Sequence, residues 1–323
     1  MLSQEQVDTF HRDGFLVIRG LFSGEELSVL QDESKKVETR GIELTQSLSI
    51  DEQKHQSVED NLFQKIDGEM RYYRSEKMWG RHPVFKAVTV KPELLQAIGQ
   101  CTGAPFAPGN DSFVCKTPRS MVPILWHQDP PYWDPSRELT FETPNFDVDI
   151  YLQPSTDENG CVYGIPGHHL VGHVDMKDKT QEALFSEHGA VPIEMQPGDV
   201  LFHCLSAPHG SRGNPTDDTR SIFYLHYASE DVAENGYPGW RDYDQNVELM
   251  SEMSEIRESM GFNVAHLEDH ELQFSDKGVE YLGKINTPPK YWGTLITEMS
   301  ESEIEQKKSL TYQMAKANNM EDS

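Results

Sequence analysis

The sequence predicts a mainly β protein with flanking helices, built as an antiparallel sandwich or jelly roll. From about residue 110 onward, apolar residues fall in short runs that are separated by Gly, Pro and Asn. No helical segments alternate with these runs, and this texture is typical of antiparallel sandwiches and jelly rolls. The runs span residues 111–116, 122–128, 146–153, 161–165, 191–195, 199–204 and 220–227.

The opening of the chain predicts two helices. Ser3 with Gln6 and Ser23 with Glu26 have the spacing of a capping box, in which two side chains satisfy unpaired amides of the first helical turn. We therefore expect one helix to begin after Ser3 and a second to span residues 24–40.

Three further segments precede the jelly-roll region. Residues 14–20 form a short apolar run between glycines, which predicts a strand. The polar stretch 43–68 predicts an irregular insertion, and the segment 92–101 predicts a third helix.

The strand pattern ends after Tyr227. We therefore predict one jelly-roll domain over residues 1–229 and a C-terminal extension over residues 230–323. The extension is acidic and Met-rich, and its pattern predicts helices near 246–260 and 297–316. We expect it to pack on the same domain or to cap it.

The 323-residue chain is strongly acidic, with 28 Lys and Arg against 54 Asp and Glu and a net charge of −26. Such a charge repels phosphate backbones and anionic lipid headgroups, which disfavours nucleic acid and membranes as partners. The charge suits neutral or cationic small molecules better. No stretch approaches the roughly 20 apolar residues of a membrane helix. The four cysteines lack CxxC pairing, which indicates reduced thiols and a cytoplasmic protein.

The first candidate for chemistry is the motif His127-Gln128-Asp129. On a strand, residues i and i+2 point to one face, so the imidazole of His127 and the carboxylate of Asp129 would lie side by side. They would supply two ligands of the 2-His-1-carboxylate face that holds non-haem iron(II) and leaves positions open. Taken alone, the motif is also compatible with a surface histidine beside a turn aspartate.

A second set of motifs favours the metal interpretation. The turn at 197–199 is followed by an apolar run, by His209 and, eleven residues later, by Arg220 at the start of the next predicted strand. His209 and Arg220 would then face one cavity. Arginine binds carboxylates through two parallel hydrogen bonds, and the distal carboxylate of 2-oxoglutarate is a suitable partner. The alternative is a hairpin with a surface histidine and a surface arginine.

A series of short motifs runs through residues 3 to 228. They are Asp13-Gly14-Phe15, Lys116-Thr117-Pro118, Trp126-His127-Gln128-Asp129, Glu158-Asn159-Gly160-Cys161, Ile165-Pro166-Gly167, Pro197-Gly198-Asp199, His209-Gly210-Ser211 and Arg220. In this order they resemble the phytanoyl-CoA dioxygenase family of 2-oxoglutarate oxygenases, which includes ectoine hydroxylases. The resemblance implies a double-stranded β-helix (a cupin-like jelly roll) with helices packed on the larger sheet.

By this resemblance, His127, Asp129 and His209 bind iron(II), Arg220 and Ser211 bind 2-oxoglutarate, and dioxygen is the other cosubstrate. Related halogenases replace the carboxylate ligand by Gly or Ala. Because this chain retains Asp129, hydroxylation is the expected outcome, although desaturation, ring closure and demethylation use the same ligands.

Three more positions are compared with the family. Lys116 resembles a lysine before the metal motif and would meet 2-oxoglutarate or solvent. Trp133 corresponds to a substrate wall in ectoine hydroxylases, with simple packing as the alternative. His168 stands where the family usually has a small hydroxyl residue, so we expect it near the substrate.

The substrate side is predicted from strand faces. Over residues 146–153, alternation separates an apolar face, which should pack on the helices, from a polar face that includes Asp147, Asp149 and Tyr151. We expect the polar face to line the mouth of the barrel, with Asp149 and Tyr151 as substrate residues. An edge strand with one solvated face is the alternative. A carboxylate beside the metal favours a small cationic or zwitterionic substrate over an acyl-CoA.

The sequence therefore predicts an oxygenase that oxidises a small organic metabolite and releases succinate and CO2. Two other functions stay open at this point. A non-oxidative metal-dependent enzyme on a cupin-like barrel would have no use for Arg220. A non-catalytic protein that binds small molecules would be expected to have a broken metal triad.

Overall fold

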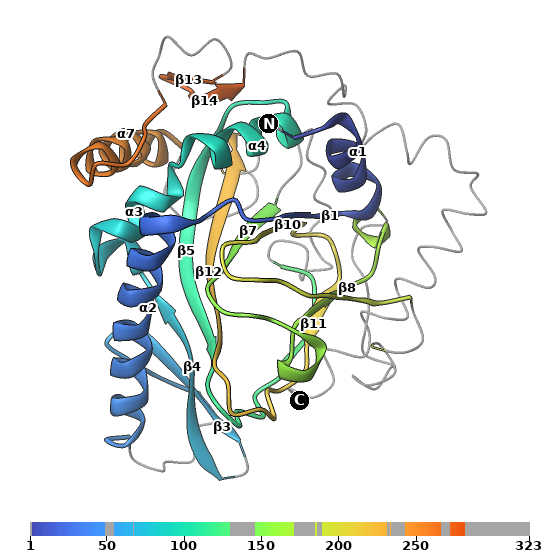
Figure 1. Cartoon of the computed structure of the whole chain (residues 1–323), viewed down its shortest axis with the longest axis vertical. Coiled ribbons are helices and arrows are strands. Elements are labelled where there is room, and N and C mark those ends of the chain that lie inside the picture. Colours follow the sequence, from blue (N-terminus) through green and yellow to red (C-terminus); the bar gives the residue numbers. More distant parts are fainter. Residues whose placement is uncertain are drawn as a thin grey trace.

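The computed structural model describes residues 2–48, 55–66, 68–129, 146–170, 185, 189–230, 233, 243–265 and 272–281. In these ranges two antiparallel sheets pack face to face, and helices lie along the outer side of the larger sheet (Figure 1). The predicted double-stranded β-helix with helices on its larger sheet is confirmed.

The larger sheet has ten strands. Its main path runs in the order β1-β10-β7-β12-β5-β4-β3-β2, while β14 pairs with β5 and with β13. The strands are Phe15–Ile18 (β1), His55–Val58 (β2), Asn61–Ile66 (β3), Glu69–Glu76 (β4), Phe106–Lys116 (β5), Phe146–Tyr151 (β7), Val200–Cys204 (β10), Arg220–Ser229 (β12), Leu272–Ser275 (β13) and Gly278–Tyr281 (β14).

The smaller sheet has four strands in the order β6-β11-β8-β9. They are Ile124–His127 (β6), Val162–Gly164 (β8), Val191–Ile193 (β9) and His209–Ser211 (β11). Each predicted apolar run from residue 110 onward coincides with a strand of one of the two sheets. The strand β11 begins at His209, as expected, but it was not among the predicted apolar runs because three residues are too few to show an alternating pattern.

The helices cover one face of the larger sheet, where Figure 1 shows α2, α3 and α7 side by side. They are Gln4–Asp13 (α1), Gly24–Thr45 (α2), Pro83–Thr89 (α3), Pro92–Thr102 (α4) and Tyr243–Ser259 (α7). Val148, Ile150 and Leu152 of the β7 segment are buried in the same cluster as helical residues such as Leu30 and Phe85. The predicted packing of this apolar face on the helices is therefore confirmed.

The two predicted capping boxes differ in outcome. At α1, the Ser3 hydroxyl accepts the Gln6 amide and the Gln6 side chain accepts the Ser3 amide, as predicted. At α2, the helix begins after Ser23, but the Ser23 side chain makes no capping hydrogen bond. The Glu26 carboxylate, which would supply the other half of the box, is buried and accepts hydrogen bonds from Lys91 and Arg257 instead.

The irregular insertion predicted over residues 43–68 was wrong. The helix α2 continues to Thr45, and β2 and β3 then extend the larger sheet beyond β4. In β3, Asn61 and Phe63 are buried and alternate with half-buried residues, while the residues toward Ile66 are all half-buried. A strand near the edge of a sheet with a solvated face has a polar composition, which hides it among loop residues.

The described part of the C-terminal extension joins the same body. The predicted helix near 246–260 is α7, whose Arg257 is fully buried and donates to the Ala87 carbonyl oxygen at 2.9 Å. The hairpin β13–β14 was not predicted, and its Val279 pairs with Phe106 of β5. The helix predicted near 297–316 lies outside the described residues. Within the described ranges, no helix has the length and apolar character needed to cross a bilayer.

Candidate metal and cosubstrate site

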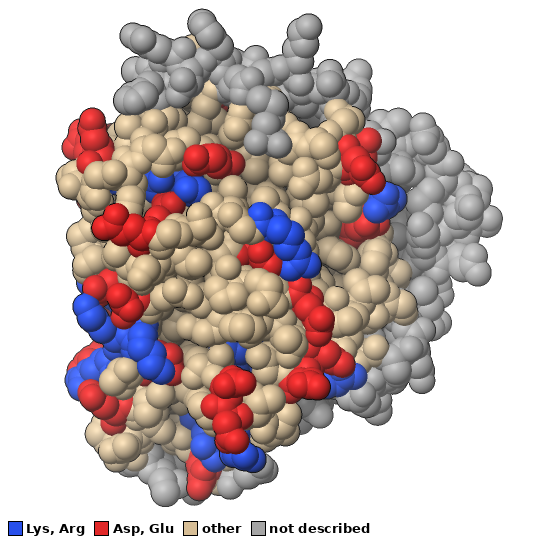
Figure 2. Space-filling model, viewed as in Figure 1, with Lys and Arg blue, Asp and Glu red and all other residues tan. Residues whose placement is uncertain are grey.

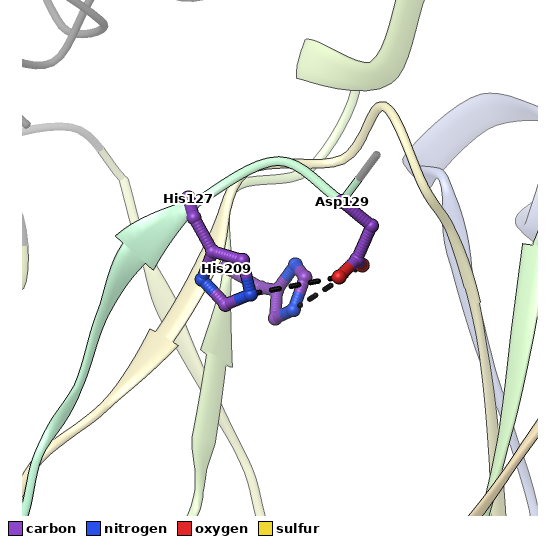
Figure 3. A group of neighbouring side chains, drawn as sticks. All are labelled: His127, Asp129 and His209. Carbon is purple, nitrogen blue, oxygen red and sulfur yellow. Dashed lines mark ion pairs between the residues drawn. The ribbon is translucent and has the colours of Figure 1, made fainter. Parts of the chain in front are cut away.

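Two histidines and an aspartate meet where β6 and β11 pair. His127 ends β6, His209 begins β11, and the two are partners in the ladder with ring centroids 4.3 Å apart. Asp129 lies just beyond β6, where its backbone amide donates to the Leu205 carbonyl oxygen at 2.9 Å. Nε2 of each imidazole lies 3.6 Å from a carboxylate oxygen of Asp129 (Figure 3).

Both imidazoles are oriented through their other nitrogen. Nδ1 of His127 lies 2.7 Å from the Leu125 carbonyl oxygen, and Nδ1 of His209 lies 3.0 Å from that of Ala207. A carbonyl oxygen can only accept, so Nδ1 carries the proton in each ring. The lone pair of each Nε2 therefore points toward Asp129, as a metal ligand requires.

The electrostatics of the cluster suit a cation. Burial, followed by the neighbouring His127, lowers the pKa of His209 to about 3. Burial would raise the pKa of Asp129, but His209 and His127 outweigh it and hold this pKa below its usual range. The Oδ2 atom of Asp129 is buried without a hydrogen-bond partner among the described residues. The three ligand atoms lie within 4.8 Å of one another, so the set fits a divalent ion such as iron(II).

Arg220, at the start of β12, is the second predicted element of the site. Its side chain is fully buried, and Nε donates to the Ser155 hydroxyl at 3.2 Å. Its Nη1 and Nη2 atoms have no hydrogen-bond partner among the described residues. Buried polar groups are nearly always hydrogen-bonded. Two unsatisfied guanidinium nitrogens therefore indicate an anionic ligand, and a carboxylate fits them in parallel.

Lys116 and Ser211 lie beside this arginine. Lys116 is the ladder partner of Arg220 and is 2% exposed. Its ammonium donates to the Ser211 hydroxyl at 2.8 Å and to the Arg212 carbonyl oxygen. Burial, followed by the charge of Arg220, lowers the pKa of Lys116 well below its ordinary value. Lys116 was expected to contact either 2-oxoglutarate or solvent, and its burial excludes solvent.

A pocket of about 110 Å³ opens between the two sheets at the triad. Residues from both sheets form its wall. They are Arg74, Asn110, Asp111, Ser112, Val114, Ile124, His127, Asp129, Asp147, Val162, His203, His209, Gly210, Ser211, Tyr224 and His226.

The substrate residues predicted from β7 need correction. Asp149 and Tyr151 point inward as predicted, but they are 1% and 0% exposed and are not among the residues that line the pocket. His168 also lies outside the pocket wall, with Nδ1 3.2 Å from the Pro166 carbonyl oxygen. Trp133 falls outside the described residues. Asp147 is the carboxylate of β7 that lines the pocket, where it accepts a hydrogen bond from His226 Nδ1 at 2.8 Å.

Asp149 is buried because it has a partner that sequence reasoning missed. His203 of β10 places its Nε2 3.3 Å from Oδ1 of Asp149, and its ring centroid lies 4.6 Å from that of His209. Burial would lower the pKa of His203, but Asp149 outweighs it and raises this pKa to about 10. The cation that Asp149 was expected to require is therefore supplied by the protein. Arg74 was missed as well, because its strand lies next to the stretch taken for an insertion.

This combination of a double-stranded β-helix, a His-Asp-His cluster and a buried arginine defines the class of non-haem iron oxygenases that use 2-oxoglutarate. The sequence model of the phytanoyl-CoA dioxygenase (PhyH) family matches residues 10–222. The chain belongs to this family. It is an iron(II)- and 2-oxoglutarate-dependent dioxygenase, as the sequence motifs predicted.

Several named relatives match most of the chain. Methylphosphonate hydroxylase of Gimesia maris is 24% identical over 241 residues, which cover 73% of this chain and 85% of the relative. Ectoine dioxygenase of Bordetella parapertussis is 22% identical over 254 residues, which cover 71% of this chain and 76% of the relative.

Solved structures have the same fold. AviO1 from Streptomyces viridochromogenes matches with a TM-score of 0.56 and 20% identity, covering 75% of this chain and 98% of that one. EctD from S. alaskensis with 2-oxoglutarate and 5-hydroxyectoine matches with a TM-score of 0.54 and 20% identity, covering 72% of this chain and 77% of that one.

Proposed function

We propose that His127, Asp129 and His209 hold iron(II) in this chain and that Arg220 binds the distal carboxylate of 2-oxoglutarate. The observation that carries the proposal is the pair of buried, unpartnered guanidinium nitrogens of Arg220 in the same fold as the triad. A non-oxidative cupin-like metal enzyme would leave these nitrogens without a function. A non-catalytic binding protein would not need three intact ligands.

The chemistry divides between the cosubstrates and the protein. Bound iron(II) supplies the centre at which dioxygen is activated as 2-oxoglutarate loses CO2. Of the two oxygen atoms, one enters succinate and the other enters the product, which is hydroxylated. Arg220 fixes one end of 2-oxoglutarate, while Lys116 orients the Ser211 hydroxyl that faces the pocket. Burial of these groups excludes water, which strengthens their electrostatic attraction for the cosubstrate.

The substrate that we propose is a small cationic or zwitterionic metabolite. Two observations support this substrate class: Asp147 lines the pocket, and the chain has a net charge of −26. On the face shown in Figure 2, acidic side chains lie among basic ones, so this face has no large patch of one charge. Attraction of a cationic substrate at close range therefore depends on the residues of the pocket. Asp149 is paired with His203, so Asp147 is the carboxylate of β7 that faces the pocket.

The proposal is tested in two stages. Calorimetry without oxygen should show 2-oxoglutarate binding to the iron(II)-loaded protein. After oxygen is admitted, succinate is measured with a panel of amines, amino acids, acyl-CoA esters and neutral terpenoids. We expect an amine or amino acid to give the largest stimulation. Failure to bind 2-oxoglutarate would remove the assignment of the cosubstrate site, and a clear preference for acyl-CoA esters would contradict the substrate class.

A further inference from the structure

The pocket wall contributed by the larger sheet carries two opposite charges, one on Arg74 and one on Asp147, and the Asp147 carboxylate lies close to that of Asp129. Arg74 on β4 is the one Lys or Arg side chain among the described residues of the wall. Its side chain is 36% exposed, and its Nε donates to Glu76. The Nη atoms of Arg74 have no hydrogen-bond partner among the described residues. This guanidinium can therefore bind an anion that enters the pocket.

Three carboxylates line the pocket, and their contacts distinguish them. Asp129 belongs to the triad. Asp111 is 5% exposed and accepts the Trp79 backbone amide at 2.7 Å, which fixes the turn before α3. Asp147 has a side chain that is 19% exposed, and its Oδ1 accepts from His226. Asp147 is therefore the carboxylate that is placed to meet a cation in the pocket.

The ladder sets the separation of the two charges. Arg74 pairs with Val114 of β5, which pairs with Ile222 of β12. Asp147 of β7 pairs with His226, which lies four residues along β12 from Ile222. Three strand spacings and four residues correspond to backbone offsets of about 14 Å across the sheet and about 13 Å along it. Both side chains line the same pocket, so their charged ends lie closer together than the backbone offsets. A ligand that meets both charges must still be elongated.

We propose that the substrate is an elongated zwitterion whose oxyanion end binds Arg74 and whose ammonium end binds Asp147. Tyr224 and Ser112 face each other across the β12–β5 ladder and line the wall between these ends. Because carboxylate oxygens of Asp147 and Asp129 lie within 4.8 Å of each other, the ammonium end of this substrate and the carbons next to it lie nearest the triad. This inference rests on the proposed function, because the triad and Arg220 must be occupied by the metal and the cosubstrate rather than by the substrate.

The test measures binding without turnover. Protein loaded with iron(II) and 2-oxoglutarate in the absence of oxygen is titrated with 4-aminobutyrate, 5-aminovalerate and 6-aminohexanoate, and with the α-amino acid alanine as the compact zwitterion. We expect at least one ω-amino acid to bind and alanine to bind at least about tenfold more weakly, since alanine can form one of the two charge-assisted contacts but not both. If the wild-type protein binds none of the ω-amino acids, or binds alanine equally well, the proposal is wrong.

Charge exchange then assigns the ends. Arg74→Glu should abolish binding of the ω-amino acid and create binding of the diamine of the same length. Asp147→Asn should weaken the binding of the ω-amino acid at least about tenfold and leave the binding of the monocarboxylic acid of the same length unaffected. Arg71→Glu, a change on the same strand at a residue outside the pocket wall, is the matched control and should have no effect.

The failure modes are distinguishable. Arg74→Gln, which keeps the length of the side chain, is measured in parallel in case the charge reversal disturbs folding. If the Arg74 variants weaken the binding of 2-oxoglutarate instead of the binding of the ω-amino acid, Arg74 belongs to the cosubstrate site. The inference is then refuted, while the oxygenase assignment stands. If wild-type protein fails to bind 2-oxoglutarate, the proposed function itself fails.

Discussion

Replacement of Arg220 by alanine should separate cosubstrate binding from folding. In the ligand-free protein the guanidinium is fully buried, with the Ser155 hydroxyl as its hydrogen-bond partner among the described residues. Because Arg220 is not paired with a carboxylate of the described residues, its replacement leaves no buried carboxylate without a partner. We therefore expect the free energy of unfolding of the ligand-free protein to stay level or to rise, because an incompletely satisfied buried charge is costly.

The cost should instead be seen in the affinity for 2-oxoglutarate. Breaking a buried pair of charges by removing one partner costs about 3–5 kcal/mol. At about 1.4 kcal/mol per factor of ten, the dissociation constant of 2-oxoglutarate should rise by roughly two to almost four powers of ten. The metal affinity should be unchanged, since none of the three proposed iron ligands contacts Arg220.

Two measurements check this prediction together. Calorimetry under nitrogen gives the affinity of the iron(II)-loaded variant for 2-oxoglutarate. Thermal unfolding with and without 2-oxoglutarate gives the stabilisation by the ligand, which should be about 2.7 kcal/mol at one hundred times the dissociation constant and should disappear in the variant. Arg119→Ala, at an exposed arginine paired with Asp217, is the control. A variant that lost stability in the ligand-free state but bound 2-oxoglutarate normally would refute the reasoning.

Three further predictions concern the metal, the extension and pH. Asp129→Ala should abolish tight iron(II) binding and succinate release while the circular dichroism spectrum stays native; an unchanged iron affinity would refute the triad. Arg257→Ala should lower the free energy of unfolding by about 3–5 kcal/mol in urea titrations, because Glu26 loses a buried partner; a change no larger than that from the exposed Arg40→Ala would contradict this role. Burial lowers the pKa of His11 to about 4 and of His169 to about 3, so the unfolded chain binds protons that the folded chain does not. Stability should then fall as pH drops from about 6.5 toward those values, at up to about 1.4 kcal/mol per unit for each group, and His169→Gln should flatten the decline.

Local sequence patterns predicted the residues whose positions depend on short distances along the chain. His127 and Asp129 are two residues apart at the end of one strand, so alternation alone brings their side chains together. His209 and Arg220 are each near the start of a strand, where motif order identified them. The apolar face of the β7 segment was likewise predicted by period-two alternation.

Contacts between side chains on different strands could not be predicted from these local patterns. Alternation predicts which face a side chain occupies but does not predict the register between strands that lie fifty residues apart. His203 stands opposite Asp147 in the β10–β7 ladder, yet its Nε2 reaches Asp149, while Asp147 is hydrogen-bonded by His226 from the other side. The His203–Asp149 pair changes the charge that a ligand would meet. The substrate role of Asp149 therefore stays a prediction, with His203 as a partner that the strand pattern did not reveal.

The same distinction explains why the reaction class was easier to predict than the substrate. The proposed metal and cosubstrate residues lie in motifs at the end of β6 and on β11 and β12. Arg74 lies on β4, which joins the sheet through β5 and follows the polar stretch that was taken for an insertion. Because His127 and His209 lie where β6 and β11 pair in the other sheet, we expect substitutions at Arg74 to leave the triad in place. If Arg74 binds the substrate as we propose, substitutions on β4 and at the facing positions of β5 should change which substrate is bound while the proposed metal ligands stay the same.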